Sequence, residues 1–264
     1  MEHSIGVAVG QFAPGTDTVA NLESVRALAD EAAASGARVL AVPEYSMFTG
    51  PKLDRTVIES AQPLDGPFVT GLLEIAQRNN LVVVAGINEL LADDPRISNT
   101  LVAAAPDGTI AAEYRKLHLY DAFGFTESDV VRPGDIEAPQ TFTVDGVTFG
   151  LQTCYDLRFP EVTRRLVDAD AHVVLLPAQW VPGPLKEEHW TTLVRARAIE
   201  NTVYVAAAGQ TAPSGAANSM IVDPMGVVVA AAGERVGTAG AQVSVARIDA
   251  VRAKNPALKL RRFL

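Results

Sequence analysis

Residues 147–161 read VTFGLQTCYDLRFPE, a strand-like apolar run that leads directly into a polar turn. Cys154, at the end of this run, is the only cysteine of the chain, which excludes a disulfide framework and a cysteine-rich metal site. The thiol is therefore either an inert buried group or a nucleophile. Because Tyr155, Asp156 and Arg158 crowd the following turn, we favour a nucleophile that a strand end delivers into a polar pocket.

Strand-length apolar runs alternate with helical patterns on both sides of this stretch. We predict strands at 4–11, 37–42, 81–87, 172–177, 203–208 and 240–248, and helices at 67–79, 160–169 and 186–201. A further helix is predicted to begin at Asp17 or Thr18, whose side chains offer capping oxygens, and to close at Gly36.

Direct strand-to-strand connections restrict the fold further. Asp-Gly pairs at 107–108 and 145–146 predict β-hairpins, and residues 224–226 predict another turn. Together with the strand–helix alternation, they predict an α/β fold in which residues 1–264 form one domain, a four-layer α-β-β-α sandwich. A doubly wound Rossmann sheet is the alternative, but hairpins suit it poorly, and no G-x-G-x-x-G follows the first strand.

The composition of the chain excludes some functions. A net charge of −9 disfavours nucleic acid and anionic membrane surfaces as partners. No apolar run approaches the ~20 residues of a membrane span, and the N-terminal residues lack a signal-peptide pattern. We therefore expect a cytoplasmic protein that binds a small molecule, and a single cysteine is compatible with that reducing compartment. The C-terminal cations are expected to form a solvated tail: Lys254, Lys259, Arg261 and Arg262.

Three groups suited to acyl transfer each follow a predicted strand: Glu44, Lys116 and Cys154. A thiol attacks only as the thiolate, so it needs a base or a nearby cation. A carboxylate can take the thiol proton and return it to a leaving amine, whereas an ammonium can stabilise the thiolate and the oxyanion. The backbone N–H of Tyr155 could complete an oxyanion hole. Taken singly, Glu44 is equally compatible with an arginine partner or a surface residue, and Lys116 with an exposed lysine.

Three segments resemble the signature blocks of the nitrilase, or carbon–nitrogen hydrolase, superfamily: PEYS (43–46), YRKLHLYDAFGFTES (114–128) and TCYDLRFPE (153–161). The likeness extends from residue 5 to about residue 250. It implies an αββα sandwich that pairs into homodimers or higher oligomers, with Glu44 as general base, Lys116 as oxyanion stabiliser and Cys154 as nucleophile. Glu127 matches the second glutamate that this family places near the lysine and the cysteine.

The resemblance also implies a reaction: hydrolysis of an amide carbon–nitrogen bond through a thioester, which releases ammonia and a carboxylic acid without a metal or organic cofactor. The segments around Lys116 and Cys154 are most similar to deaminated-glutathione amidase and ω-amidase, whose substrates carry a carboxylate. Arg158 is expected to bind this carboxylate, unless it pairs with Asp156 or Glu161. The other predicted substrate-binding residues are pocket walls: Tyr45, Tyr155 and Trp180.

One segment, PAQWVPGPL at 177–185, departs from the ω-amidase pattern and favours a bulkier or more apolar acyl group. Hydrolysis of N-carbamoyl amides or of nitriles is an alternative within the superfamily. Outside it, the alternatives are a non-catalytic scaffold and a papain-like pairing of Cys154 with His118 or His189. A thiolate stabilised by Lys116 predicts fast alkylation by iodoacetamide, and slow alkylation would favour the scaffold. The histidines are too scattered to ligate a metal: His3, His118, His172 and His189.

Two long connections and two helices are also given roles, as walls of the site and as a dimer interface. The connections 43–65 and 116–140 are longer than ordinary loops and are predicted to wall the site. Given the pairing implied by the resemblance, helices 160–169 and 186–201 are predicted to form the dimer interface.

Overall fold

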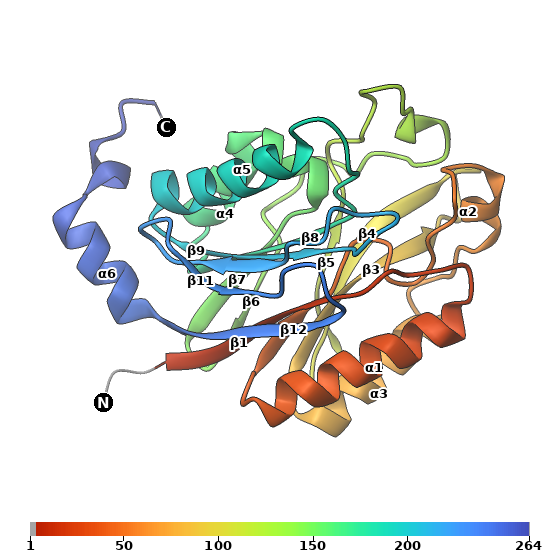
Figure 1. The fold of residues 1–264 in the computed structure, drawn as a ribbon, viewed down its shortest axis with the longest axis horizontal. Helices are drawn as coiled ribbons and strands as arrows, with labels where there is room; N and C mark the ends of the chain where they lie inside the picture. Colours follow the sequence, from red (N-terminus) through yellow and green to blue (C-terminus); the bar gives the residue numbers. More distant parts are fainter. Residues whose placement is uncertain (1–3, 264) are drawn as a thin grey trace.

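The computed structural model describes residues 4–263 and contains two six-stranded β-sheets that face each other (Figure 1). The first sheet contains β1 (Ser4–Gln11), β2 (Val39–Ala41), β3 (Val82–Leu90), β4 (Ile97–Ala104), β5 (Ile110–Arg115) and β12 (Gly237–Ser244), in the order β12-β1-β2-β3-β4-β5. The second contains β6 (Thr141–Val144), β7 (Val147–Leu151), β8 (Val173–Ala178), β9 (Tyr204–Gly209), β10 (Met220–Val222) and β11 (Val228–Ala231), in the order β11-β10-β9-β8-β7-β6.

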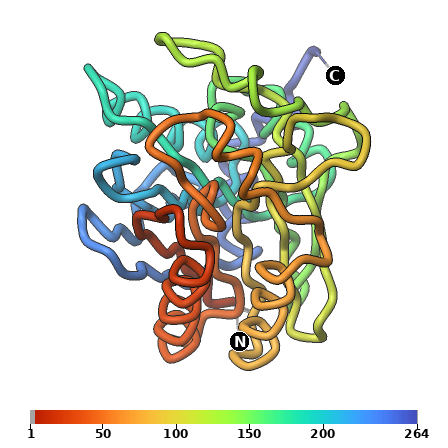
Figure 2. The backbone as a smooth tube through the Cα atoms, turned by 90° about the vertical axis from the view of Figure 1, so that its right-hand side faces the viewer, coloured from red at the N-terminus to blue at the C-terminus, as the bar shows by residue number. Residues whose placement is uncertain are grey.

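Two helices lie on the outer face of each sheet (Figures 1 and 2): α1 (Thr18–Ala34) and α3 (Pro67–Asn79) on the first, α4 (Pro160–Asp168) and α5 (Lys186–Asn201) on the second. The shorter segments are α2 (Arg55–Glu59), α6 (Val245–Lys254) and the 3₁₀ turns η1 (Glu127–Asp129), η2 (Cys154–Arg158) and η3 (Ala257–Leu260). The predicted four-layer α-β-β-α sandwich is confirmed, and the Rossmann alternative is wrong. Between residues 4 and 263, no helix is both long and apolar enough to cross a membrane.

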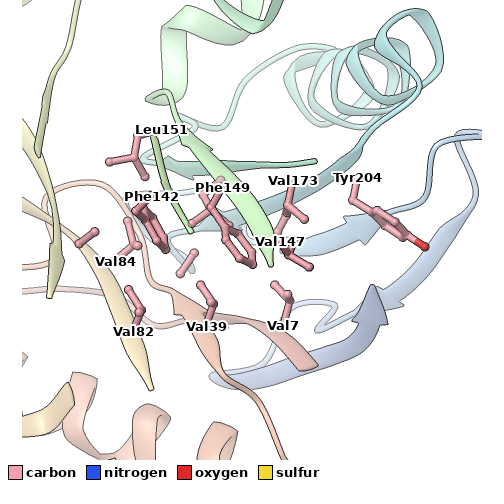
Figure 3. Close-up of a cluster of buried hydrophobic side chains, with 14 of the residues drawn as sticks. Val7, Val39, Val82, Val84, Phe142, Val147, Phe149, Leu151, Val173 and Tyr204 are labelled. Atoms are coloured by element: carbon pink, nitrogen blue, oxygen red, sulfur yellow. The ribbon is translucent and has the colours of Figure 1, made fainter. Parts of the chain in front are cut away.

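The core between the sheets is built from alternate side chains of neighbouring strands. Val7, Val39 and Val82 of the first sheet point toward Phe149 and Val173 of the second (Figure 3). In the first sheet, the intervening side chains pack against the helices α1 and α3 instead. Because both faces of these strands are buried, the strands read as unbroken apolar runs, and this is the signal by which the sequence identifies them.

Local signals in the sequence fix the ends of several helices. Asp17 Oδ1 accepts hydrogen bonds from two N–H groups of the first turn of α1, at 3.0 and 3.1 Å, so Asp17 rather than Thr18 is the N-cap. Gly36 has a φ of 82°, a left-handed conformation that turns the chain away after the helix. The helices predicted at 67–79 and 186–201 are confirmed.

Two predictions for the C-terminal part are wrong. The strand predicted at 240–248 ends at Ser244, because the Ser244 hydroxyl accepts a hydrogen bond from the N–H of Arg247 at 3.3 Å and begins α6. The cationic segment is not a free tail, because Arg261 Nη2 lies 2.7 Å from Asp168 Oδ1. This ion pair holds the chain end against the end of α4.

The topology brings several strand ends to one edge of the sandwich. In the first sheet β2 runs parallel to β1 and β3, and in the second β8 runs parallel to β7 and β9. Glu44 follows β2, Lys116 follows β5, Cys154 follows β7 and Gln179 follows β8. All four residues line one cavity.

Candidate active site

A buried ion-pair network lies at the inner end of this cavity. Lys116 Nζ donates hydrogen bonds to Glu44 Oε1 at 2.9 Å and to Glu127 Oε2 at 2.8 Å. All three residues are at most 2% exposed. Asn99 Nδ2 donates to the same two carboxylates, at 2.7 and 3.2 Å. Two carboxylates thus share one ammonium, so the network as a whole is negatively charged.

Both sheets hold Glu44 in position. Gly86 of β3 passes so close that a Cβ on it would stand 2.5 Å from the backbone nitrogen of Tyr45, so only glycine fits there. The Glu44 carbonyl accepts a hydrogen bond from Gln210 Nε2 at 2.8 Å, and Glu44 Oε2 accepts one from the N–H of Gln179 at 2.6 Å. The carboxylate is therefore oriented by the protein itself.

Glu127 organises the connection that follows β5. Its Oε1 accepts a hydrogen bond from the Tyr45 hydroxyl at 2.8 Å, and its Oε2 accepts one from the N–H of Tyr120 at 2.6 Å. Burial alone would raise the pKa of Glu127, but the Lys116 ammonium and these donors hold it below its usual value. Burial would likewise lower the pKa of Lys116, but Glu127 and Glu44 outweigh it and raise that pKa.

Cys154 occupies the first position of η2 in a left-handed backbone conformation, with a φ of 43°. Such a conformation costs a non-glycine residue of order 1–3 kcal/mol and is typical of functional turns. Asp156 supports the turn, because its Oδ2 accepts a hydrogen bond from the N–H of Thr153 at 3.0 Å. The turn presents Cys154 Sγ to the cavity, 3.7 Å from the carbonyl oxygen of Gln179.

The surroundings of Cys154 raise the pKa of its thiol. Burial raises its pKa, the Glu44 carboxylate raises that pKa further, and the Lys116 ammonium opposes this rise without cancelling it. Lys116 lowers this pKa, as predicted, but burial and the Glu44 carboxylate outweigh the effect of the lysine. It follows that slow alkylation by iodoacetamide does not separate an enzyme from a scaffold in this chain.

The histidines near the site are engaged away from the thiol. His118 Nδ1 lies 2.8 Å from Asp156 Oδ1, and His189 Nδ1 lies 3.4 Å from Arg158 Nη2. This geometry does not support the papain-like pairing. His3 lies outside the described residues, and among residues 4–263 no group of three or more His, Cys, Asp and Glu side chains is arranged to hold a metal ion.

The cavity walls include the three predicted residues Tyr45, Tyr155 and Trp180. Parts of both long connections, 43–65 and 116–140, line it as well. Arg158 lies behind this lining, with its Cζ 4.9 Å from the centre of the Trp180 ring. The alternative pairing of Arg158 with Asp156 or Glu161 is not formed. Asp156 contacts His118, and Arg158 has no ion pair in the described part of the chain. The Nε of Arg158 is buried without a hydrogen-bond partner among these residues.

A second lysine, Lys186, lines the outer part of the cavity and was not identified from the sequence. It is the first residue of α5 and is 6% exposed. Its Nζ donates a hydrogen bond to the Tyr120 hydroxyl at 2.8 Å and lies 5.0 Å from the centres of the Phe123 and Trp180 rings. The available signal was its place directly after the divergent segment 177–185.

Comparison with known proteins agrees with this geometry. The sequence profile of the carbon–nitrogen hydrolase family matches residues 6–253. The chain belongs to this family. A hydrolase of Mycobacterium tuberculosis is 40% identical over 263 residues, which cover 93% of this chain and 91% of that protein. The deaminated glutathione amidase of Escherichia coli O157:H7 is 39% identical over 257 residues, 97% of each chain.

A solved structure extends the comparison to the nitrilase superfamily. Nit3 of Saccharomyces cerevisiae, a member of that superfamily, matches with a TM-score of 0.87 at 27% identity, over 98% of this chain and 97% of Nit3. In this carbon–nitrogen hydrolase, three separate connections bring Glu44, Lys116, Glu127 and Cys154 together in one cavity, and Lys116 and Glu127 come from the same connection after β5. Without the family resemblance, Glu127 reads as a loop surface residue, because nothing in its local sequence indicates burial.

Proposed function

We propose that the chain hydrolyses the carbon–nitrogen bond of a small amide through a thioester on Cys154. One observation carries this proposal: the Cys154 thiol lines the same cavity as the Glu44 carboxylate, whose Oε1 lies 2.9 Å from the buried Lys116 ammonium. A nucleophile, a proton acceptor and a fixed cation within one cavity are the groups that acyl transfer needs.

In the first half of the reaction, the Cys154 proton passes to Glu44 while the sulfur attacks the amide carbon and forms a carbon–sulfur bond. The carbonyl oxygen becomes an oxyanion, which Lys116 Nζ and the N–H of Tyr155 stabilise. Such donors each contribute roughly 3–4 kcal/mol to transition-state stability. Glu44 then gives the proton to the nitrogen and the carbon–nitrogen bond breaks, which releases ammonia from a primary amide, or the amine from a substituted amide, and leaves a thioester on Cys154.

In the second half, water attacks the thioester while Glu44 takes one of its protons. The carbon–sulfur bond breaks, the carboxylic acid departs, and the proton returns to Cys154. Glu127 keeps the Lys116 ammonium in place and charged throughout, because it accepts two of its hydrogen bonds, at 3.0 and 2.8 Å.

We propose a small amide with a carboxylate, such as deaminated glutathione, as the substrate. The likeness to the deaminated glutathione amidase of Escherichia coli O157:H7 supports this class, as does the cationic side chain of Arg158 beside the cavity wall. ω-Amidase, N-carbamoyl-amide hydrolase and nitrilase activities are the alternatives, as is a non-catalytic scaffold. We further propose a single-domain cytoplasmic enzyme, a homodimer through α4 and α5, that needs no cofactor.

Ammonia release tests the proposal on 2-oxoglutaramate, aliphatic amides, N-carbamoyl compounds and nitriles, and release of the free amine tests it on deaminated glutathione, whose amide nitrogen is substituted. Cys154→Ala, Glu44→Gln and Lys116→Ala should each reduce turnover of the best substrate by about 10⁴-fold. Lys254→Ala, a change at an exposed lysine of α6, is the control and should match the wild type. Near wild-type turnover in any of the first three variants would contradict the role given to that residue.

A further inference from the structure

The outer part of the cavity holds a cation that no carboxylate of the protein neutralises. Lys186 is 6% exposed, yet among residues 4–263 none of the ion pairs within 4.0 Å involves it. Glu187 and Glu188, in the first turn of α5, are exposed, and neither forms an ion pair with Lys186, although the Glu187 charge does act on it. A buried ammonium is normally paired, so its isolation here requires an explanation.

Aromatic rings account for how the cation is held without an acid. Lys186 Nζ lies 4.7 Å from the centre of the Tyr120 ring and 5.0 Å from those of Phe123 and Trp180. Faces of aromatic rings attract cations at such distances. They leave the N–H groups free, however, and the one hydrogen bond of Lys186 Nζ within the described residues goes to the Tyr120 hydroxyl. An ammonium has three donors, so two remain for a ligand.

A second cation lies beside the same rings. Arg158 Cζ is 4.9 Å from the centre of the Trp180 ring and 5.9 Å from that of Phe123. Burial is the largest cause of the lowered pKa of Lys186; the Arg158 charge lowers this pKa further, whereas Cys154 and Glu187 act in the opposite direction without cancelling the effect. Arg158 and Lys186 repel each other because both are positively charged and lie near the same rings. An anion bound near both cations would offset this repulsion.

The position of Lys186 in its helix also works against the stability of the free protein. It is the first residue of α5, where the helix dipole disfavours a cation. The inner end of the cavity, by contrast, carries an excess of carboxylate through Glu44 and Glu127. One cavity thus contains a carboxylate-rich cluster around Lys116 and a separate ammonium without an ion pair at Lys186, which suits a ligand with a neutral amide at one end and an anion at the other.

We propose that Lys186 is a specificity-determining residue that binds the carboxylate of the substrate, while the amide end lies at Cys154. Lys186 would thereby recognise the anionic end of the carboxylate-bearing amide proposed above as the substrate. This inference rests on the proposed function for the orientation of the ligand. It adds Lys186, which directly follows the segment 177–185 that departs from the ω-amidase pattern, to the carboxylate site otherwise assigned to Arg158 alone.

Ligand binding without turnover tests the inference. The Cys154→Ala protein is titrated by calorimetry with glutaramate and with pentanamide, which differ only in a carboxylate in place of a methyl group. Glutaramate should bind about tenfold or more tightly than pentanamide. Adding Lys186→Met should weaken glutaramate by about tenfold or more and leave pentanamide unchanged, whereas Lys254→Met should change neither. Lys186→Arg, which keeps a cation, should restore part of the preference.

Equal glutaramate affinity with and without Lys186→Met would overturn the inference, and so would a Cys154→Ala protein that binds neither amide or does not distinguish them. Lys186→Gln, which keeps a donor for Tyr120, gives the same test if the methionine variant does not fold. Failure of the proposed function would instead be seen as a wild type that releases neither ammonia nor an amine from any amide, a result independent of these affinities.

Discussion

The two buried lysines of the cavity differ in how their charge is balanced. Lys116 has two carboxylate partners, Glu44 and Glu127, within 2.9 Å. Lys186 has only a hydroxyl and aromatic rings around its ammonium. The protein itself neutralises the charge of Lys116 and so fixes the position of its ammonium. The charge of Lys186 has no such partner and is available to an anionic ligand. Burial alone therefore does not reveal the role of a charged residue, but its partners do.

Replacing each lysine by methionine tests most directly whether the charges of Lys116 and Lys186 are balanced differently. Lys116→Met leaves two buried carboxylates without a cation and should lower the free energy of unfolding by about 3–5 kcal/mol. Lys186→Met removes a charge that no acid compensates and should change it by about 1 kcal/mol or less. Chemical denaturation measures both values. Equal losses in the two variants would mean that the lysines do not differ in the way described.

Removing one carboxylate of the inner network sharpens the same contrast. In Glu127→Gln the shape is kept, but the charge that raises the pKa of Lys116 is lost, so this pKa should fall. Lys116 then loses its proton at a lower pH, so the alkaline limb of the pH profile of kcat/KM should move to lower pH. At neutral pH, kcat/KM should fall by about tenfold. Glu113→Gln, a change at a partly exposed carboxylate paired with Arg115, is the control. An unshifted alkaline limb would argue against Glu127 as the partner that keeps Lys116 charged.

His172, which does not line the cavity, is expected to make the stability of the protein depend on pH. His172 Nδ1 accepts a hydrogen bond from the N–H of Thr148 at 3.0 Å, and burial lowers the pKa of His172 below 6.5. The unfolded chain therefore binds a proton more readily, and this part of the stability is present above pH 6.5 and is lost as the pH falls through the folded-state pKa. Thermal melting should show a smaller decrease in Tm between neutral and acidic pH for His172→Gln than for the wild type. The same decrease in both proteins would exclude His172 as a source of acid sensitivity.

Much of the fold was predictable because its signals are local. The two-face burial of the strands gives unbroken apolar runs, and capping residues such as Asp17 and Gly36 mark helix ends. The strand predicted to extend through 240–248 was wrong because the Ser244 cap was not recognised. Of the candidate site, the three polar groups after strands were identifiable because parallel strands bring such positions to one edge.

The remaining features depend on contacts between distant segments. Lys186 is buried by Tyr120 and Phe123, which come from a connection more than sixty residues earlier in the chain. The raised pKa of Cys154 depends on its burial and on Glu44, whose carboxylate is oriented by the second sheet. Neither effect has a sequence pattern of its own, since each arises only when the two sheets and their connections are assembled.

Cys154 is expected to carry the acyl group as a thioester during turnover. Wild-type protein is mixed with glutaramate, quenched in acid within the first turnovers, and its intact mass and Cys154 peptide are measured. We expect a mass increase equal to the acyl group on that peptide, with ammonia released, and neither in Cys154→Ala. Ammonia release by Cys154→Ala at the wild-type rate, with no adduct on the wild-type thiol, would contradict the account.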